Sequence, residues 1–166
     1  MFPLFLFLNT IKIVGYMLRL SKKVEYALIA LIDLAKTNEQ QPTTAKYLAE
    51  HYQMPQELLG KVMQTLTKNG LLQSVQGVKG GYILGKKPEQ IKLSQIIEIL
   101  EGPISITSCG LNHEDLCGCD IISTCTIRSP LEIIQLELSK YFESISLKDL
   151  RTNYYNGVSA PIQLTV

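Results

Sequence analysis

The chain has 166 residues, 46% of them hydrophobic and 19% charged, with a formal net charge of +1. This length suits one domain, or one small domain with an appendage, and it allows a hydrophobic core that needs no disulfide staples. The charge is uneven. Residues 17–88 contain ten Lys and Arg against five Asp and Glu (net +5), and residues 89–166 contain five against ten (net −5). The first half is therefore the candidate for binding a polyanion.

Residues 1–16, MFPLFLFLNTIKIVGY, form an apolar stretch before Met17. The stretch is too short to span a bilayer, has no basic n-region and leads into no small-residue cleavage site. We therefore expect a cytoplasmic protein without a membrane partner. Met17 is the expected start, which makes residues 1–16 a non-native upstream extension or a disordered tail.

Apolar residues at intervals of three and four predict three helices in the first half of the chain. The first runs from Ser21 to about residue 36, and Thr43 or Thr44 caps the second, which continues through residue 52. The third has Pro55 at its first position and ends at Asn69-Gly70. Its polar face carries these candidate DNA-contacting residues: Gln56, Lys61, Gln64, Thr65 and Lys68.

The tight turn between the second and third helices predicts a helix-turn-helix whose second helix enters a major groove. A plain three-helix core with a solvated face is the other interpretation. Two short strand-like segments, 71–72 and 82–84, then flank the Gly-rich stretch 74–81, which predicts a hairpin wing. Glycines allow close approach to phosphates and lysines neutralise them. The wing's candidate DNA contacts are Gln76, Lys79, Gly80 and Tyr82. A protein-binding winged helix is the alternative function of this unit.

All four cysteines of the chain fall within residues 109–125. Such clustering indicates ligands of one site rather than scattered core residues. The segment lacks the C-x2-C knuckle of common zinc sites, whereas iron–sulfur clusters accept irregular spacings and a substituted ligand. We therefore expect a cluster. Zinc, a metal-free thiol switch, a disulfide pair and inert cysteines are the alternatives. The cysteines are Cys109, Cys117, Cys119 and Cys125.

Two further helices are predicted on either side of the cysteine segment. The first covers about residues 93–100 and ends at the Glu-Gly-Pro of residues 101–103. The second begins at a capping box, Ser129 to Glu132, with Pro130 at its first position. Its apolar stripe predicts a dimer helix, although packing within the chain would give the same pattern. The stripe comprises Leu131, Ile134, Leu138, Tyr141 and Ile145.

The fold class is therefore mainly α with a small β-hairpin wing. We divide the chain into a winged helix-turn-helix DNA-binding domain (17–88), a region with linker helix, cysteine loop and long dimerisation helix (89–150), and a flexible tail (151–166). The combination resembles the Rrf-two family of bacterial winged-helix transcription factors, which includes iron–sulfur cluster regulators of the IscR, NsrR and RirA kind. The resemblance covers residues 17–151 and rests on LRLSKKVEYALIAL, TLTKNGLLQSVQGVKGGYIL, KLSQIIEILEGP and CTIRSPLEIIQ. The portion from EGPISITSC to CTIRS looks closest to the subgroup that regulates the SUF cluster-assembly operon.

The resemblance implies a homodimer on a palindromic double-stranded DNA operator, with one cluster per subunit, [2Fe-2S] rather than [4Fe-4S]. Cys109 and Cys125 match the family's first and last ligands. Cys119 matches the middle one, since it precedes Cys125 by the family's five-residue gap. Cys117 remains an alternative, because a seven-residue first gap also occurs in the family.

Two positions depart from the family's pattern. Some relatives use a histidine three residues after the last cysteine, where this chain has Arg128, a permanent cation that cannot ligate iron. Other relatives take a carboxylate from the first helix, and Glu25 occupies that place, with His113 as a local competitor. A solvated or ion-paired Glu25 is equally expected. Gln76 stands where the family's wing usually has an arginine, which should weaken DNA contact or alter the operator that is read.

The sequence thus predicts a cluster-sensing transcriptional regulator, not an enzyme, which controls cluster-assembly or redox and iron stress genes. The alternatives are a redox-thiol or zinc-containing winged-helix regulator without a cluster, and a thiol redox protein. No helix-N-terminal CxxC and no cofactor-binding motif supports the thiol redox protein.

Overall fold

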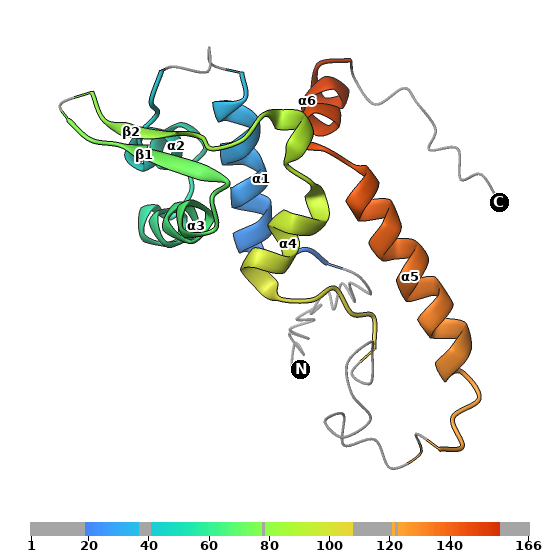
Figure 1. Ribbon diagram of the computed structural model, residues 1–166. Coiled ribbons are helices and arrows are strands. Elements are labelled where there is room, and N and C mark those ends of the chain that lie inside the picture. The colour runs from blue at the N-terminus through green and yellow to red at the C-terminus, as the bar shows by residue number, and fades with distance from the viewer. Residues whose placement is uncertain (1–18, 37–40, 78, 108–120, 122, 157–166) are drawn as a thin grey trace, which may run out of the picture.

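The computed structural model describes residues 19–36, 41–77, 79–107, 121 and 123–156. In Figure 1, α1 to α4, α6 and the hairpin gather together and α5 extends away from them, so the predicted fold, mainly helical with a small hairpin, is confirmed. The elements in chain order are α1 (Lys22–Leu34), α2 (Ala45–His51), α3 (Gln56–Lys68), β1 (Leu72–Val75), β2 (Gly81–Leu84), the 3-10 helix η1 (Pro88–Gln90), α4 (Leu93–Glu101), α5 (Arg128–Ser144) and α6 (Leu147–Asn156).

Side-chain caps start the first two helices where the sequence predicts them. The Ser21 hydroxyl accepts a hydrogen bond from the Val24 N–H at 3.4 Å, and the Thr44 hydroxyl accepts one from the Tyr47 N–H at 3.1 Å. Such caps satisfy N–H groups that have no acceptor within the helix. Thr44, rather than Thr43, is therefore the cap of α2.

The apolar stripe of α1 lies at the centre of the core. Helices α3, α4 and α6 and strand β2 all pack against α1. Its five buried side chains are at most 4% exposed: Val24, Ala27, Ala30, Leu31 and Leu34. The largest fully buried side chains from the other elements and their connections are Leu48, Leu59, Met63, Leu66, Leu71, Leu72, Ile91, Ile96 and Leu147.

A tight turn joins α2 to α3. Gln53 adopts φ +53°, the left-handed conformation that commonly ends a helix, and the Met54 N–H donates to the Ala49 carbonyl at 2.8 Å. Pro55 has extended backbone angles and is the N-cap of α3 rather than its first helical residue, which corrects the sequence prediction by one position. Its fixed φ of about −65° suits both places, so the sequence alone does not separate them.

The wing is a two-stranded antiparallel hairpin in which Leu72 lies opposite Leu84 and Val75 opposite Gly81. Strand β1 takes in residues 74 and 75, which the sequence assigned to the Gly-rich turn. The backbone of Tyr82 also exchanges two hydrogen bonds with Thr43, at 3.0 and 2.9 Å, and so ties the wing to the residue before the α2 cap. A Cβ on Gly81 would lie 2.7 Å from Thr43 backbone atoms, so this close pairing requires glycine.

An antiparallel bridge joins the start of α4 to the connection between α5 and α6. The Leu93 N–H donates to the Ile145 carbonyl at 2.9 Å, and the Leu147 N–H donates to the Ile91 carbonyl at 2.8 Å. These bonds bring together segments about fifty residues apart in the chain. They fix the end of α5 nearest the core against α4.

Helix α6 is capped by a reciprocal pair of hydrogen bonds. The Ser146 N–H donates to Asp149 Oδ2 at 2.9 Å, and the Asp149 N–H donates to Ser146 Oγ at 3.2 Å. The hydrogen bond from the Ser146 hydroxyl, followed by the one from its backbone, lowers the pKa of Asp149. Arg151 Nη1 donates to the Ala35 carbonyl at 2.6 Å and docks α6 on the end of α1. Helix α6 ends at Asn156, so residues 151–156, which the sequence assigned to a flexible tail, are helical.

Helix α5 starts earlier than predicted. Its first residue is Arg128, its N-cap is Ile127, and no side-chain cap bond is formed, so the capping box expected at Ser129 is absent. The first helical hydrogen bond is donated by the Leu131 N–H to the Ile127 carbonyl at 3.0 Å, so the bonding starts at Ile127 rather than at Ser129. Pro130 still falls in the first turn of α5. A backbone N–H at that place has no acceptor within the helix, so proline breaks no helical hydrogen bond there.

Gln135 is a buried polar residue on α5, with 2% of its surface exposed. Its Oε1 accepts from the Ile106 N–H at 2.8 Å, and its Nε2 donates to the Ile104 carbonyl at 2.6 Å and to Ser139 Oγ at 3.1 Å. The amide thus accepts a hydrogen bond from one residue of the 104–106 segment and donates one to another. We call this pair of hydrogen bonds the clamp. The clamp holds residues 104–106, which lead into the cysteine segment, against α5.

We predict that Gln135→Leu, which keeps the volume but leaves the Ile104 carbonyl and Ile106 N–H without partners, lowers the free energy of unfolding by about 1–3 kcal/mol. Urea unfolding of the full chain measures this. Ser139→Ala is the matched control, since it removes one bond to the same amide and leaves the two backbone bonds. Equal destabilisation by the two variants would contradict the role of the clamp.

Candidate nucleic-acid interface and cysteine segment

Helix α3 presents its polar face to solvent, as the sequence predicts. Helix α2 packs against it across the turn, which is the helix-turn-helix arrangement. The buried side chains are Leu59, Val62, Met63 and Leu66. The predicted contact residues that are exposed are Gln56, Lys61, Gln64 and Lys68. These side chains are therefore available to a duplex.

Thr65 differs from its neighbours on α3. It is half-buried, and its hydroxyl donates to the Lys61 carbonyl at 2.9 Å. This bond within the helix occupies the hydroxyl proton, so only the oxygen remains to accept from a base. Among the predicted residues of α3, Thr65 is the one with least freedom to contact DNA.

Glu57 lies on the same exposed face, and the sequence prediction missed it. Lys61 Nζ donates to Glu57 Oε1 at 2.7 Å, and this hydrogen bond, together with the positive charge of Lys61, lowers the pKa of Glu57. The four-residue spacing of the two charges was the signal in the sequence. The ion pair directs Lys61 along the helix rather than away from it.

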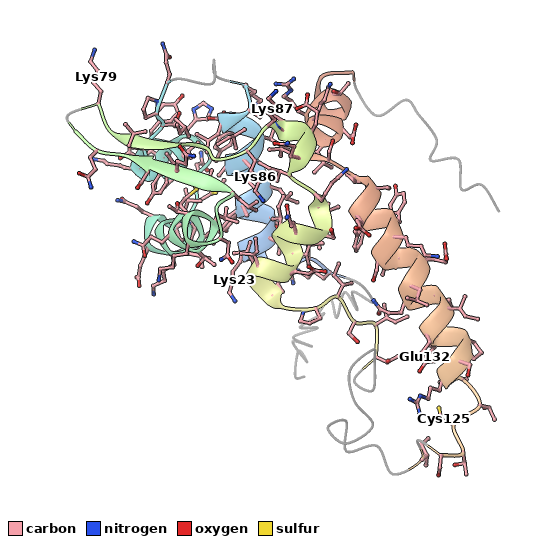
Figure 2. All side chains as sticks on the ribbon, in the orientation of Figure 1. Lys23, Lys79, Lys86, Lys87, Cys125 and Glu132 are labelled. Atoms are coloured by element: carbon pink, nitrogen blue, oxygen red, sulfur yellow. The ribbon has the colours of Figure 1, made fainter. Side chains whose placement is uncertain are left out.

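The hairpin wing also carries exposed polar side chains. Figure 2 shows Lys79 at the tip of the hairpin, with Lys86 and Lys87 where β2 ends. Gln76 is also exposed. A lysine held on a projecting hairpin suits neutralisation of a phosphate.

Gly80 and Tyr82 have structural roles in the wing. A Cβ on Gly80 would lie 2.5 Å from the Val75 carbonyl oxygen, so the turn itself requires glycine there. Tyr82 is half-buried and packs against the core, and its backbone pairs with Thr43. The DNA contacts predicted for Gly80 and Tyr82 stay predictions.

Cys125 is the cysteine that the structure describes. It is a half-buried free thiol, three residues before α5, and Figure 2 shows it at the outer end of that helix. The other candidate ligands, Cys109, Cys117, Cys119 and His113, lie outside the described residues. Within the described part of the chain, no three His, Cys, Asp or Glu side chains gather into a potential metal site.

Glu25 lies in the first turn of α1 and forms an ion pair with Lys22. At the same end of α1, the Ser21 hydroxyl donates to Glu101 Oε1 at 2.7 Å, and Lys23 Nζ lies 3.5 Å from that oxygen. Glu101 is the last residue of α4, after which the chain leads toward the cysteine segment. Glu25 is therefore placed at the end of the domain from which the cysteine segment departs.

Arg128 stands where a ligand would be expected in some relatives of the predicted family. Its Nε donates to Glu132 Oε1 at 3.0 Å across the first turn of α5. Figure 2 shows Glu132 near the same end of α5 as Cys125. A guanidinium has no lone pair for a metal, and here it also pairs with the Glu132 carboxylate.

None of the helices in the described residues combines the length and apolar character needed to cross a membrane.

A family model decides the family of the chain. The Rrf2 model, described as iron-dependent transcriptional regulator, matches residues 20–153. The match extends from the start of α1 through the cysteine segment and α5 into α6. The chain belongs to the Rrf2 family. The resemblance to this family that the sequence indicated is thereby confirmed.

Several relatives of this Rrf2 protein are named transcriptional regulators. NsrR of Oceanobacillus iheyensis is 32% identical over 139 residues, which cover 82% of this chain and 91% of that protein. CymR of Bacillus subtilis is 38% identical over 88 residues, 53% of this chain. In that alignment the chain spans only 64% of the length of CymR.

Solved structures agree with the winged-helix fold. CymR, described as the global cysteine regulator of B. subtilis, matches with a TM-score of 0.65 at 31% identity, over 81% of this chain and 97% of that one. The IscR of T. potens matches with a TM-score of 0.66 at 28% identity, over 87% of this chain and 93% of that one. The relatives are transcriptional regulators rather than enzymes, which agrees with the sequence prediction for this Rrf2 protein.

Proposed function

We propose that this Rrf2 protein is a cytoplasmic, DNA-binding transcriptional regulator that senses an iron–sulfur cluster. It binds a palindromic operator as a homodimer, and its targets are genes for cluster assembly or for redox and iron stress. The observation that carries the proposal is the position of Cys125, which ends the cysteine segment three residues before α5 in a chain whose α3 has an exposed polar face.

The DNA contacts follow from the exposed side chains. Gln64 and Lys61 on α3 face the bases, because amide and ammonium groups supply the donors and acceptors that a major groove reads. Lys79 on the wing binds phosphate, which sets register without reading sequence. The net charge of +5 over residues 17–88 favours association with a polyanion.

The chemistry of the donor set fits an iron–sulfur cluster, since four thiols lie within seventeen residues of sequence. Cys109, Cys119 and Cys125 would hold it, with Glu25 as fourth ligand and Cys117 and His113 as alternates. We favour [2Fe-2S] over [4Fe-4S]. When bound, the group would make the segment responsive to oxidation and to iron supply. A carboxylate is a harder ligand than a thiolate, so the link to Glu25 would be the first to break.

Among the described residues, hydrogen bonds hold the stretch that leads into the cysteine segment at two places. Glu101 is bonded to Ser21 at the start of α1, and Gln135 holds residues 104–106 against α5. A displacement of the segment would therefore reach both the domain that carries α3 and the helix that extends from it. This connection supports control of DNA affinity by the state of the segment.

A second copy of the chain would cover the apolar side chains that α5 exposes. Ile133 is 63% exposed, Ile134 is 54% exposed and Leu136 is 48% exposed. Apolar side chains clustered on an extended helix favour association, and a two-fold dimer places the same face on both partners. Of the predicted stripe, Ile134 faces solvent, whereas Ile145 packs within the chain.

A regulator without a cluster is the second candidate. It uses the cysteines as redox thiols or binds zinc through them, on the same winged-helix domain. The observation that favours it is the 38% identity to CymR, which is described as a cysteine regulator. The first experiment below separates the two, because iron–sulfur clusters absorb visible light whereas zinc and thiols do not.

We predict that anaerobically purified protein is coloured and contains iron and acid-labile sulfide. Cys119→Ala abolishes the colour and the iron, because it removes a ligand, whereas Cys117→Ala at the neighbouring thiol retains both. Ultraviolet–visible spectra and iron and sulfide assays measure this. Retention in Cys119→Ala with loss in Cys117→Ala would exchange the two assignments, and colourless unmodified protein would support the cluster-free regulator.

Glu25→Ala is expected to keep a cluster with an altered visible spectrum and to uncouple DNA affinity from the redox state, since the fourth ligand is lost. Lys22→Ala is the matched control, because it removes the ion pair of Glu25 but leaves the carboxylate. Spectra and DNA titrations of oxidised and reduced protein give the answer. If Glu25→Ala behaves as the unmodified protein does, Glu25 is a surface residue and another group is the fourth ligand.

Lys79→Ala and Gln64→Ala should weaken DNA binding in different ways. Loss of one phosphate contact per subunit lowers affinity for all duplexes alike and reduces the slope of log K against log salt by about 0.9 for each contact. Loss of Gln64 relaxes preference at one base pair by about 1–3 kcal/mol. Fluorescence anisotropy across salt concentrations measures both, with Lys140→Ala on α5 as control. Unchanged binding in both variants argues against this interface.

A further inference from the structure

The described residues include seven glycines, and six of them have a reason within the chain to be glycine. Three have φ between +73° and +119°, which disfavours any side chain: Gly70, Gly77 and Gly102. Three others would place a Cβ within 2.8 Å of backbone atoms: Gly80, Gly81 and Gly85. The seventh, Gly60, has neither feature.

Gly60 lies in the middle of α3 with ordinary helical geometry, and a Cβ built on it meets no atom within 4 Å. Glycine weakens a helix interior relative to alanine because it loses more backbone freedom on folding. No packing contact in the described structure offsets that weakness. Nothing in the described part of the chain therefore accounts for the absent side chain.

The neighbours of Gly60 on the helix surface are residues that we propose face DNA. Gln56 lies one turn before it and Gln64 one turn after it, and both are exposed. Glu57 and Lys61 lie beside it and form an ion pair, with 2.7 Å between Lys61 Nζ and Glu57 Oε1. Gly60 is thus a gap in the side-chain layer of α3, with an amide at each end.

We propose that Gly60 is the point where α3 approaches the base edges of duplex DNA most closely. This inference rests on the proposed DNA-binding function. A major groove about 12 Å wide barely admits a helix about 10–12 Å in diameter, so a side chain at the centre of the contact decides how deeply the helix enters. The gap at Gly60 lets the amides of Gln56 and Gln64 reach bases on both sides. Gly60 is therefore a specificity-determining residue, although it has no side chain to contact a base.

The test is a pair of substitutions whose effects on stability and on binding have opposite signs. Gly60→Ala raises the Tm by roughly 1–4 °C, because alanine favours the helix. The same change weakens binding to a preferred duplex by roughly 5–100-fold, similar to a mismatched base pair. Gly60→Leu weakens it further, because a longer side chain holds the helix farther from the bases.

The preferred duplex is obtained by selection from a random-sequence library with the unmodified full-length protein. Binding of all variants to that duplex and to an unselected one is measured by fluorescence anisotropy. Affinity for the unselected duplex stays within about twofold, since phosphate contacts give nonspecific binding. Thr152→Ala, which improves helix propensity at an exposed position of α6, is the matched control.

A Gly60→Ala protein that is more stable and binds the selected duplex as tightly as the unmodified protein overturns the inference while leaving the proposed function intact. Failure of the unmodified protein to select any sequence overturns the proposed DNA-binding function and this inference together. Equal losses in Gly60→Ala and Thr152→Ala would also overturn it, because the effect would then be a general result of helix stabilisation.

Discussion

The structure depends on the burial of one face of α1. Ala27 and Ala30 are fully buried between larger apolar neighbours, and α3, α4 and α6 all pack against α1. Helix α3, which we propose faces DNA, and α4, which leads toward the cysteine segment, are consequently held by the same element. Close packing transmits small displacements because a filled core has few ways to absorb them.

Polar contacts then determine where the outer segments lie. The hydroxyl of Ser21 caps α1 and also bonds to Glu101, so a single side chain joins the start of α1 to the end of α4. Gln135 makes the equivalent connection from α5 to residues 104–106. Buried amides with all their bonds satisfied give directional contacts that apolar packing cannot supply. The two connections define where the cysteine segment enters the fold.

Charge is distributed by role along the proposed DNA surface. On α3 the charge of Lys61 is balanced by Glu57, and the amides of Gln56 and Gln64 are exposed beside this pair, whereas Lys79 on the wing is exposed at the tip of the hairpin. Phosphates attract unpaired cations over several ångströms, and base edges are distinguished by short hydrogen bonds. This division suits a wing that positions the protein and a helix that reads sequence.

The sequence by itself determined the local features: the apolar periods of α1 to α4, the cap at Ser21, a second cap at Thr43 or Thr44, and the clustering of the cysteines, because each depends on residues within a turn or two. Only the tertiary structure decided the features that depend on distant partners. The strand pairing with Thr43, the docking of Arg151 on Ala35 and the burial of Gln135 all join segments more than twenty-five residues apart. The absence of any contact at Gly60 is likewise visible only in three dimensions, because a sequence does not show the space around a residue.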